Sequence, residues 1–382
     1  MNNILFVTRH NPYIRSGGGL ATKAFINAFS KLFCNKLDLI IADNCITDDS
    51  IQVANIYKAS QRSSLKRFVS LFTGHLHRFT PLVNKVITEN EYNICILDGS
   101  IIGGDLVESL NRKGIFTITI HHNYEPDYHK DNKSVESFKG HFLYHIKNNE
   151  RKAYLHSKLN LFLTEFDYKK FKETYGKSQG ESFVIGIFEP EITSILKNKI
   201  KTSDFPSIVI SGAMHSTQTI IGIADFYNNY WNSTQKILNK FELTLTGRNP
   251  EGNIYQQMHK HNNVKIKPNP IDIYEIIAQN NIYCCPTCVG GGIKLRVMDG
   301  LRLGLFILVH EISARGYDAF FEYPWFQIYH DQESYINGLQ KIKEQLTQHN
   351  PQNIQEKYHA YFSFEAGVNR LYTILKRMNL IK

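Results

Sequence analysis

Residues 290–300 read GGGIKLRVMDG, three glycines followed by a segment that carries two cations and a carboxylate. The apolar run Ile282–Pro286 comes before the glycines. A helical pattern begins at Ile293 and stops at Gly304, where a second apolar run, Leu305–Val309, follows. This order of strand, glycine turn, helix and strand predicts one βαβ unit, and the residues of its turn suit a phosphate and a ribose.

The same alternation of short apolar runs and amphipathic stretches fills the first half of the chain and restarts in the second. The expected strands of the first half are Ile4–Val7, Leu37–Ala42, Ile94–Asp98, Phe116–Ile120, Leu159–Leu163 and Phe183–Ile187. Those of the second half are Ser207–Ser211, Phe241–Thr246, Val264–Ile266, Ile282–Cys285 and Leu305–Val309. Strands separated by helices pair in parallel through right-handed crossovers. The pattern predicts two Rossmann-like doubly wound α/β domains that face an interdomain cleft.

A length of 382 residues suits two such domains, each large enough to bury its own core. We expect an N-terminal domain over residues 1–190 and a linker over residues 191–206, which is rich in lysine and flanked by prolines. A C-terminal domain over residues 207–355 and closing helices over residues 356–382 would complete the chain. We see no short internal repeat.

The composition is that of a soluble protein, because 42% of the residues are hydrophobic, 21% are charged, and no run approaches the roughly 18 apolar residues that span a bilayer. The amino terminus resembles a first strand rather than a secretory signal, which favours the cytoplasm. The six cysteines are too sparse for a disulfide framework. Cys285 and Cys288 form a single CxxC with no second pair of ligands, so apolar packing is favoured over zinc.

Residues 50–88 hold the local excess of positive charge, because this segment contains no acid. Its basic side chains are Lys58, Arg62, Lys66, Arg67, His75, His77, Arg78 and Lys85, interleaved at roughly helical spacing with Leu65, Phe68, Val69, Leu71, Phe72 and Leu76. Two interpretations stay open: a solvated helix packed on its domain, or a helix on the anionic inner face of a membrane. Nucleic acid is disfavoured as a partner.

Two turns of the first half carry groups suited to a ligand. Ser16–Gly19 follows the first strand and opens a helix, so its backbone N–H groups and the helix dipole favour an anion, although the turn is not GxGxxG. An ordinary tight turn is the alternative. The strand Phe116–Ile120 ends in His121, His122 and Glu125, which could donate to or position a sugar hydroxyl. Here the alternative is a turn with one histidine bonded to backbone.

The second half places cations and an acid at its expected strand ends. Arg248 lies in the turn TGRNP, where a guanidinium suits bidentate phosphate contact unless it is simply solvated. Lys294 is expected in the first helical turn, leaning back toward a bound phosphate. Asp299 suits the two hydroxyls of a ribose, or else it pairs with Arg296 three residues before it.

Together these segments resemble the retaining GT-B glycosyltransferases of group 1, the GT4 family. The resemblance rests on TGRNP, a strand that ends at Pro286, and GGGIKLRVMDGLRLG, in that order. SGAMHSTQ, TIHHNYE and LTEFDYKKFKETYG are similar to further segments of that family. The similarity is strong over residues 207–316 and looser before residue 190.

The resemblance implies a nucleoside-diphosphate sugar held mainly by the second domain and an acceptor approached from the first. It assigns catalytic roles to His121, Arg248 and Lys294. It assigns donor contacts to Gly18, Gly19, Gly212, Arg248, Gly291, Gly292, Ile293, Lys294 and Asp299, and acceptor-side contacts to Gly17, His122 and Glu125. Three positions depart from the family pattern: Gly291 and Asp299 replace its two glutamates, and Arg315 stands where a glutamate is common.

The resulting hypothesis is a cytoplasmic transferase, with the inner face of the membrane as a place of action, that moves a sugar to a glycan or lipid-linked acceptor with retention. Surface polysaccharide or lipopolysaccharide synthesis is the expected setting. We expect no cofactor and no metal, because the sequence contains no Asp-x-Asp pair. A nucleotide-sugar epimerase on the same fold and a non-catalytic basic scaffold that binds membrane or nucleic acid are the alternatives.

Overall fold

The computed structural model describes residues 3–127, 143–192 and 205–381, except residues 15, 61, 62, 64, 66, 67, 70–77 and 349. The chain divides into two compact units. Unit 1 comprises Met1–Thr193 and Phe362–Lys382, and unit 2 comprises Ser194–Tyr361. Within the described residues, no helix has both the length and the apolar character needed to cross a membrane.

Unit 1 is built on a seven-stranded sheet in the order β3-β2-β1-β4-β5-β6-β7, and every pairing in it is parallel. The strands are β1 (Ile4–Thr8), β2 (Leu37–Ala42), β3 (Asn55–Ala59), β4 (Ile94–Asp98), β5 (Phe116–His121), β6 (Leu159–Phe162) and β7 (Glu181–Val184). Chain order reverses beside β1, which has β2 on one side and β4 on the other. Ligands bind at such a switch point in doubly wound sheets, beyond the carboxyl ends of the strands.

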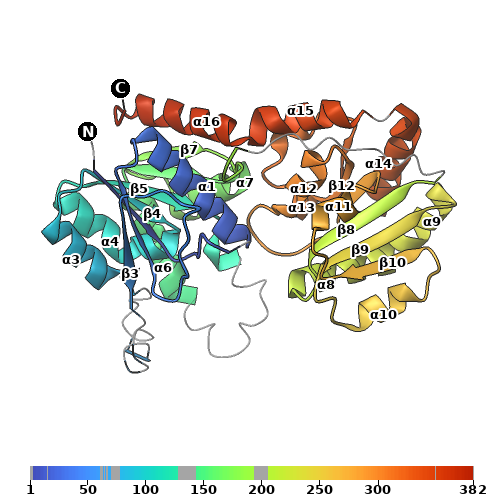
Figure 1. Ribbon diagram of the computed structural model, residues 1–382, viewed down its shortest axis with the longest axis horizontal. Helices are drawn as coiled ribbons and strands as arrows, with labels where there is room; N and C mark the ends of the chain where they lie inside the picture. The colour runs from blue at the N-terminus through green and yellow to red at the C-terminus, as the bar shows by residue number, and fades with distance from the viewer. Residues whose placement is uncertain are drawn as a thin grey trace. The chain divides into compact units, whose positions relative to one another are not determined.

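Helices cover both faces of this sheet (Figure 1). They are α1 (Gly17–Leu32), α3 (Thr80–Glu89), α4 (Ser100–Arg112), α6 (Leu143–His156), α7 (Glu165–Tyr175) and α16 (Phe364–Arg377). A core cluster formed with α3 and α4 includes Leu5, Val7 and Leu106. On the α1 side, Phe25 meets Phe188 edge-on, with ring centroids 5.1 Å apart. Alternate residues of the strands therefore pack into two separate apolar layers, one on each face of the sheet.

Unit 2 has a six-stranded parallel sheet in the order β10-β9-β8-β11-β12-β13. The strands are β8 (Ser207–Ala213), β9 (Glu242–Arg248), β10 (Val264–Pro268), β11 (Ile282–Cys285), β12 (Phe306–His310) and β13 (Phe326–Tyr329). The two sheets are the doubly wound α/β structures that the sequence predicts.

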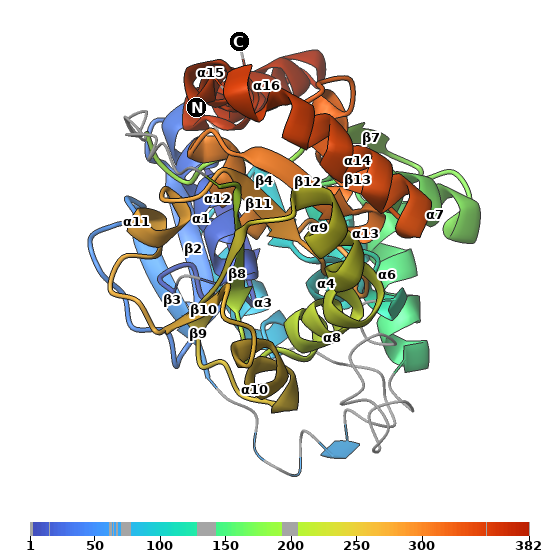
Figure 2. The same ribbon diagram turned by 90° about the vertical axis from the view of Figure 1, so that its right-hand side faces the viewer.

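The helices of unit 2 lie on both faces of its sheet. Figure 2 shows α9 and α14 on one side of β8 and β11, with α11 and α12 on the other. The helical segments are α8 (Thr217–Asp225), the π-helix η3 (Phe226–Tyr230), α9 (Trp231–Leu238), α10 (Asn253–His259), α11 (Ile273–Ile277), α12 (Arg296–Arg302), α13 (Glu311–Ala314), η4 (Asp318–Phe320), α14 (Gln332–Gln345), η5 (Leu346–Gln348) and α15 (Pro351–Phe362). Gly300 lets α12 approach β11, because a Cβ there would lie 2.6 Å from the Tyr283 side chain.

Several sequence-based expectations changed or fall outside the described residues. Strands β3 and β13 were not expected. The basic residues Arg62, Lys66, Arg67, His75 and His77, and the apolar residues Leu71, Phe72 and Leu76, lie outside the described residues. So do most of the expected linker and the first part of the helical stretch before α6.

Candidate functional site

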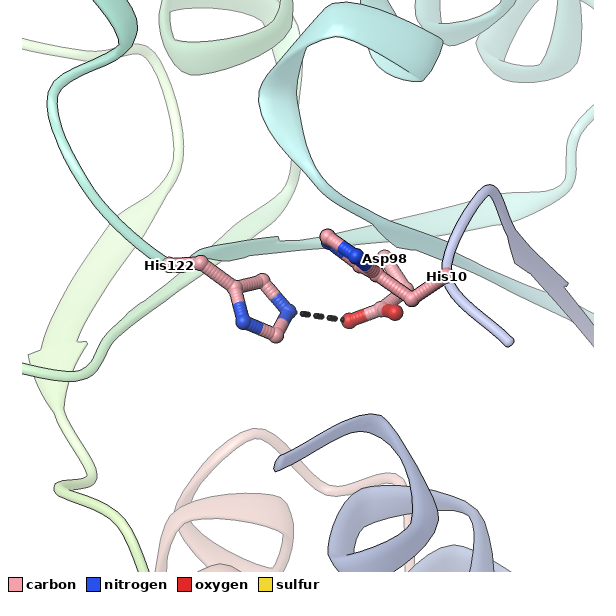
Figure 3. A group of neighbouring side chains, drawn as sticks. All are labelled: His10, Asp98 and His122. Carbon is pink, nitrogen blue, oxygen red and sulfur yellow. Dashed lines mark hydrogen bonds and ion pairs between the residues drawn. The ribbon is translucent and has the colours of Figure 1, made fainter. Parts of the chain in front are cut away.

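A buried carboxylate organises the carboxyl edge of the sheet in unit 1. Asp98 ends β4 and is fully buried. Its Oδ2 accepts hydrogen bonds from the hydroxyls of Thr8 (2.7 Å) and Thr22 (2.6 Å). Its Oδ1 accepts a third from Nε2 of His122 at 2.6 Å, the contact drawn in Figure 3. The ends of β1, β4 and β5 and the first turns of α1 thus meet at one charged group.

His10 is the third side chain of this cluster and comes from the loop after β1 (Figure 3). Its ring centroid lies 5.0 Å from that of His122. Its backbone N–H donates to Thr8 Oγ1 at 3.0 Å, which fixes the loop. Gly18 gives the ring its space, because a Cβ at position 18 would lie 2.6 Å from His10 Nδ1.

The glycine turn at the start of α1 is explained by this packing. The helix begins at Gly17, which is exposed, and the side chain of Ser16 caps it by accepting from the Gly19 N–H at 3.1 Å. A Cβ at Gly19 would lie 2.5 Å from the Asn11 carbonyl oxygen. Gly18 and Gly19 are therefore required by close contacts within unit 1.

Burial and neighbouring charge set the protonation of the cluster. Burial alone would raise the pKa of Asp98, but the charge of His122 and hydrogen bonds from His122 and Thr22 outweigh it and hold that pKa below its ordinary value. Burial, and then the nearby His122, lower the pKa of His10 to about 4. At neutral pH the cluster therefore presents an ionised carboxylate beside the neutral imidazole of His10.

The two adjacent histidines at the end of β5 point in opposite directions. His121 is fully buried, stacks on Phe162 with centroids 4.5 Å apart, and bonds through Nε2 to Asn160 Oδ1 at 2.9 Å. Successive strand residues face opposite sides of a sheet, so His122 faces the α1 side and Asp98 instead. In this placement His121 cannot touch a ligand, and burial lowers its pKa to about 4.

Glu125 is held by an ion pair, with its Oε1 2.7 Å from Nη2 of Arg9 and its side chain 3% exposed. Its backbone N–H donates to Oε2 of Glu150 at 2.9 Å. Glu150 is buried in α6, and burial together with the negative charge of Glu125 raises the pKa of Glu150 well above its ordinary value. Glu150 and Arg9 were not predicted from the sequence, because neither lies in a recognisable motif.

In unit 2, two glycines lie side by side at the ends of β8 and β9. Gly212 pairs with Gly247, with φ angles of 142° and 146°. A Cβ at Gly247 would lie 1.9 Å from the carbonyl oxygen of Gly212, so the two strand ends approach more closely than a side chain permits. Arg248 follows at the end of β9 and is exposed.

The segment that follows β11 differs from expectation, because α12 begins at Arg296 and not at Ile293. Lys294 therefore lies in the loop before the helix, and it is 7% exposed. Its Nζ donates to the carbonyl oxygen of Gly291 at 2.8 Å, while its own carbonyl accepts from the Tyr317 hydroxyl at 2.9 Å. The ammonium group folds back over the glycine loop, in which Gly292 is buried and Gly291 and Ile293 are half-buried.

Arg296, the first residue of α12, contacts both β8 and α8. Its Nη1 donates to Thr219 Oγ1 at 2.9 Å and lies 3.4 Å from the carbonyl oxygen of Ser211. A Cβ at Gly212 would lie 2.7 Å from the same nitrogen. From the sequence, Arg296 was expected as one of the two cations of this segment or as a partner of Asp299, which is half-buried in the first turn of α12.

The structure thus brings the predicted residues together in two groups. Gly18 and His122 gather in unit 1 around Asp98 and His10, and Glu125 is tied by the ion pair to the residue before His10. In unit 2, Gly212 lies against Arg296 at the end of β8, and Gly291 and Lys294 lie in the loop just before Arg296. Asp98 and His10 could have been found from sequence, since Asp98 ends an apolar strand and His10 lies two residues after one.

Comparison with known proteins identifies the fold. No protein-family model matches the sequence, and no curated protein matches it. Among solved structures, sucrose-phosphate synthase from Thermosynechococcus elongatus matches with a TM-score of 0.70 and 11% identity over 99% of both chains. The apo lipopolysaccharide outer core galactosyltransferase WaaB matches with a TM-score of 0.69 and 8% identity over 98% of this chain and 99% of the other.

A third similar structure is HepE from Anabaena in complex with UDP. It matches with a TM-score of 0.68 and 12% identity over 98% of this chain and 100% of the other. At such identities the likeness concerns the fold. The chain has the GT-B fold that these proteins share, an α/β architecture of two doubly wound units on parallel sheets of seven and six strands.

Proposed function

We propose that this protein is a retaining glycosyltransferase of the GT4 type that transfers a sugar from a nucleoside diphosphate to a glycan or lipid-linked acceptor. The observation that carries the proposal is the coincidence of two findings. The fold matches, over nearly the whole chain, a solved structure that was determined in complex with UDP. Of the residues suited to a diphosphate and a ribose, Arg248 ends β9, while Lys294 and Asp299 lie in the loop and helix that follow β11. Doubly wound sheets bind ligands beyond the carboxyl ends of their strands.

In unit 2, we assign the diphosphate to Arg248 and Lys294. Arg248 is an exposed guanidinium at the end of β9. Lys294 can exchange its bond to the Gly291 carbonyl for a phosphate oxygen, because that bond lies within its own loop. Asp299 would hold the ribose, with Gly291, Gly292 and Ile293 shaping the loop. Gly212, which has no side chain, would allow the donor to lie close to the backbone at the end of β8.

In unit 1, we assign the sugar and acceptor to the edge that carries Asp98. His122 replaces His121 as the proposed contact to the reacting sugar, because its ring lies at this edge and not in the aromatic core. Asp98 orients His122 through the 2.6 Å bond. Gly17 begins α1, whose free N–H groups suit an oxygen of the donor or acceptor.

The chemistry requires that negative charge on the departing diphosphate be stabilised as the bond to the anomeric carbon breaks. Arg248 and Lys294 would supply that stabilisation. The new bond forms on the same face of the sugar, and an oxygen of the leaving phosphate takes the acceptor proton. We propose that no metal bridges the donor phosphates, since the candidate cations serve instead.

Surface polysaccharide or lipopolysaccharide synthesis in the cytoplasm, at the inner face of the membrane, is the setting we propose. One similar structure is a lipopolysaccharide outer core galactosyltransferase, which supports this setting. Membrane contact through residues 50–88 is tested by sedimentation with anionic liposomes after Arg62, Lys66 and Arg67 are neutralised. Unchanged binding would exclude Arg62, Lys66 and Arg67 as the membrane contact.

The deciding experiment is a thermal-shift screen with nucleoside diphosphates and their sugars, because a ligand that binds only the folded state raises its melting temperature. The donor found in this way is then incubated with glycan and lipid-linked acceptors, and the anomeric configuration of the product is read by NMR. An inverted product would refute retention. Formation of an epimer of the donor in the absence of acceptor would favour an epimerase.

A further inference from the structure

The cluster of His10, Asp98 and His122 combines two imidazoles with one carboxylate. One ligand atom from each residue can be chosen so that all three lie within 4.8 Å of one another. A search of the described residues for three or more His, Cys, Asp or Glu side chains that lie this close together finds this one group. Two histidines and a carboxylate are a donor set that holds Zn²⁺ and related divalent ions in proteins.

The hydrogen bonds around Asp98 leave one oxygen directed at the histidines. Thr8 and Thr22 both donate to Oδ2 and so occupy its two acceptor positions. Oδ1 faces Nε2 of His122. Metal-ligating carboxylates are commonly oriented by such outer hydrogen bonds, which here come from β1 and α1.

His10 supplies a second observation that points to a ligand. Its Nε2 is buried and has no hydrogen-bond partner in the described part of the chain. A buried polar atom of this kind is unfavourable unless something binds it. His10 is also fixed from two sides, by its N–H bond to Thr8 and by the close approach of Gly18.

We propose that His10, Asp98 and His122 form a binding site for one divalent transition metal ion of the Zn²⁺ class. Two metal–ligand bonds of about 2.1 Å at a tetrahedral angle separate the ligand atoms by about 3.4 Å. The 2.6 Å contact of His122 with Asp98 must therefore open by less than an ångström, which a small rotation of His122 provides. Three protein ligands leave a fourth position for water or a hydroxyl.

This proposal departs from the expectation that the chain binds no metal. That expectation came from the missing Asp-x-Asp pair, which concerns a metal bridging the donor phosphates. The three ligands proposed here are separated by long stretches of chain and meet only when β1, β4 and β5 pair. The site shares His122 and Asp98 with the proposed sugar contact, but its test reads metal binding alone and does not depend on transferase activity.

The test is titration of the full chain, without a histidine tag and stripped by a chelator, with ZnCl₂ and with CoCl₂. We expect one ion per chain, and visible absorption of bound Co²⁺ with the intensity of four-coordinate geometry. His10→Gln and His122→Gln should each weaken Zn²⁺ binding at least about tenfold, and Thr22→Val, which keeps all three ligands, about tenfold. His259→Gln, at an exposed position on α10, is the matched control and should bind as the parent does.

Absence of stoichiometric Zn²⁺ binding to the parent protein would overturn the proposal, as would unchanged binding by both His10→Gln and His122→Gln. Melting temperatures recorded in chelator show whether each variant folds. Should a histidine variant fail to fold, the Co²⁺ spectrum of the parent and the Thr22→Val titration still decide. Co²⁺ or Zn²⁺ binding of unchanged affinity in Thr22→Val would place the ion elsewhere.

Discussion

Replacement of His121 by phenylalanine distinguishes two roles for this residue: a buried neutral side chain that stabilises the fold, or a catalytic group. Asn160 donates through Nδ2 to the Tyr154 carbonyl, so its Oδ1 accepts from Nε2–H of His121. The other ring nitrogen, Nδ1, is buried and has no partner among the described residues. Protonation would place a second N–H there with no acceptor, which explains why burial lowers the pKa of His121 to about 4.

The size of the effect follows from that shift. The unfolded chain binds a proton on this residue near pH 6.5 and the folded chain only near pH 4, so stability contributed by neutral His121 is lost as the pH falls through this window. Between pH 7 and pH 4.5 the loss amounts to roughly 2.5 kcal/mol. Phenylalanine keeps the ring contacts but cannot be protonated. It also leaves the Asn160 oxygen without its donor, at a cost of about 1–3 kcal/mol at every pH.

The assay is urea unfolding of the parent, His121→Phe and the exposed control His259→Phe at several pH values from 7 to 4.5. The parent and the control should lose stability more steeply with acid than His121→Phe, by roughly 2.5 kcal/mol over this range. His10 contributes equally to the pH dependence of unfolding in all three proteins, so its contribution cancels when they are compared. Equal slopes for the parent and His121→Phe would refute the reasoning. At pH 7, His121→Phe should retain sugar transfer, whereas a catalytic His121 requires that it be lost.

Three further predictions concern unit 2. Lys294→Ala should weaken binding of a nucleoside diphosphate about 10–100-fold by calorimetry, the value of a charged hydrogen bond, and unchanged binding and turnover would contradict its role. Gly247→Ala should lower the free energy of unfolding by roughly 1–3 kcal/mol more than Gly252→Ala. Both glycines have positive φ, but only at Gly247 would the Cβ meet a backbone oxygen, so equal losses would exclude the clash. Nucleoside diphosphate affinity should be the same with and without EDTA, and a loss in EDTA that also occurs in His10→Gln would show that a metal bridges the phosphates.

The fold was largely predictable because its strands are short apolar runs between helical stretches. The missed strands carry weaker signals: β3 has exposed polar residues, and β13 comes late in a segment rich in aromatic residues. The site was only partly predictable. The sequence placed His121 and His122 at a strand end, but which ring faces the core depends on the register of β5 with β6. The start of α12 at Arg296 likewise depends on tertiary contacts, because Arg296 bonds to Thr219 and Ser211.

The return of α16 to unit 1 has a consequence for how the protein is made. Arg370 donates to the carbonyl oxygens of Ile185 and Ile187, and the Glu189 N–H donates to the Phe362 carbonyl. Unit 1 is therefore assembled from the first and the last parts of the chain. Because residues 362–382 are synthesised after all of unit 2, unit 1 cannot complete its fold until the chain of unit 2 has already been made.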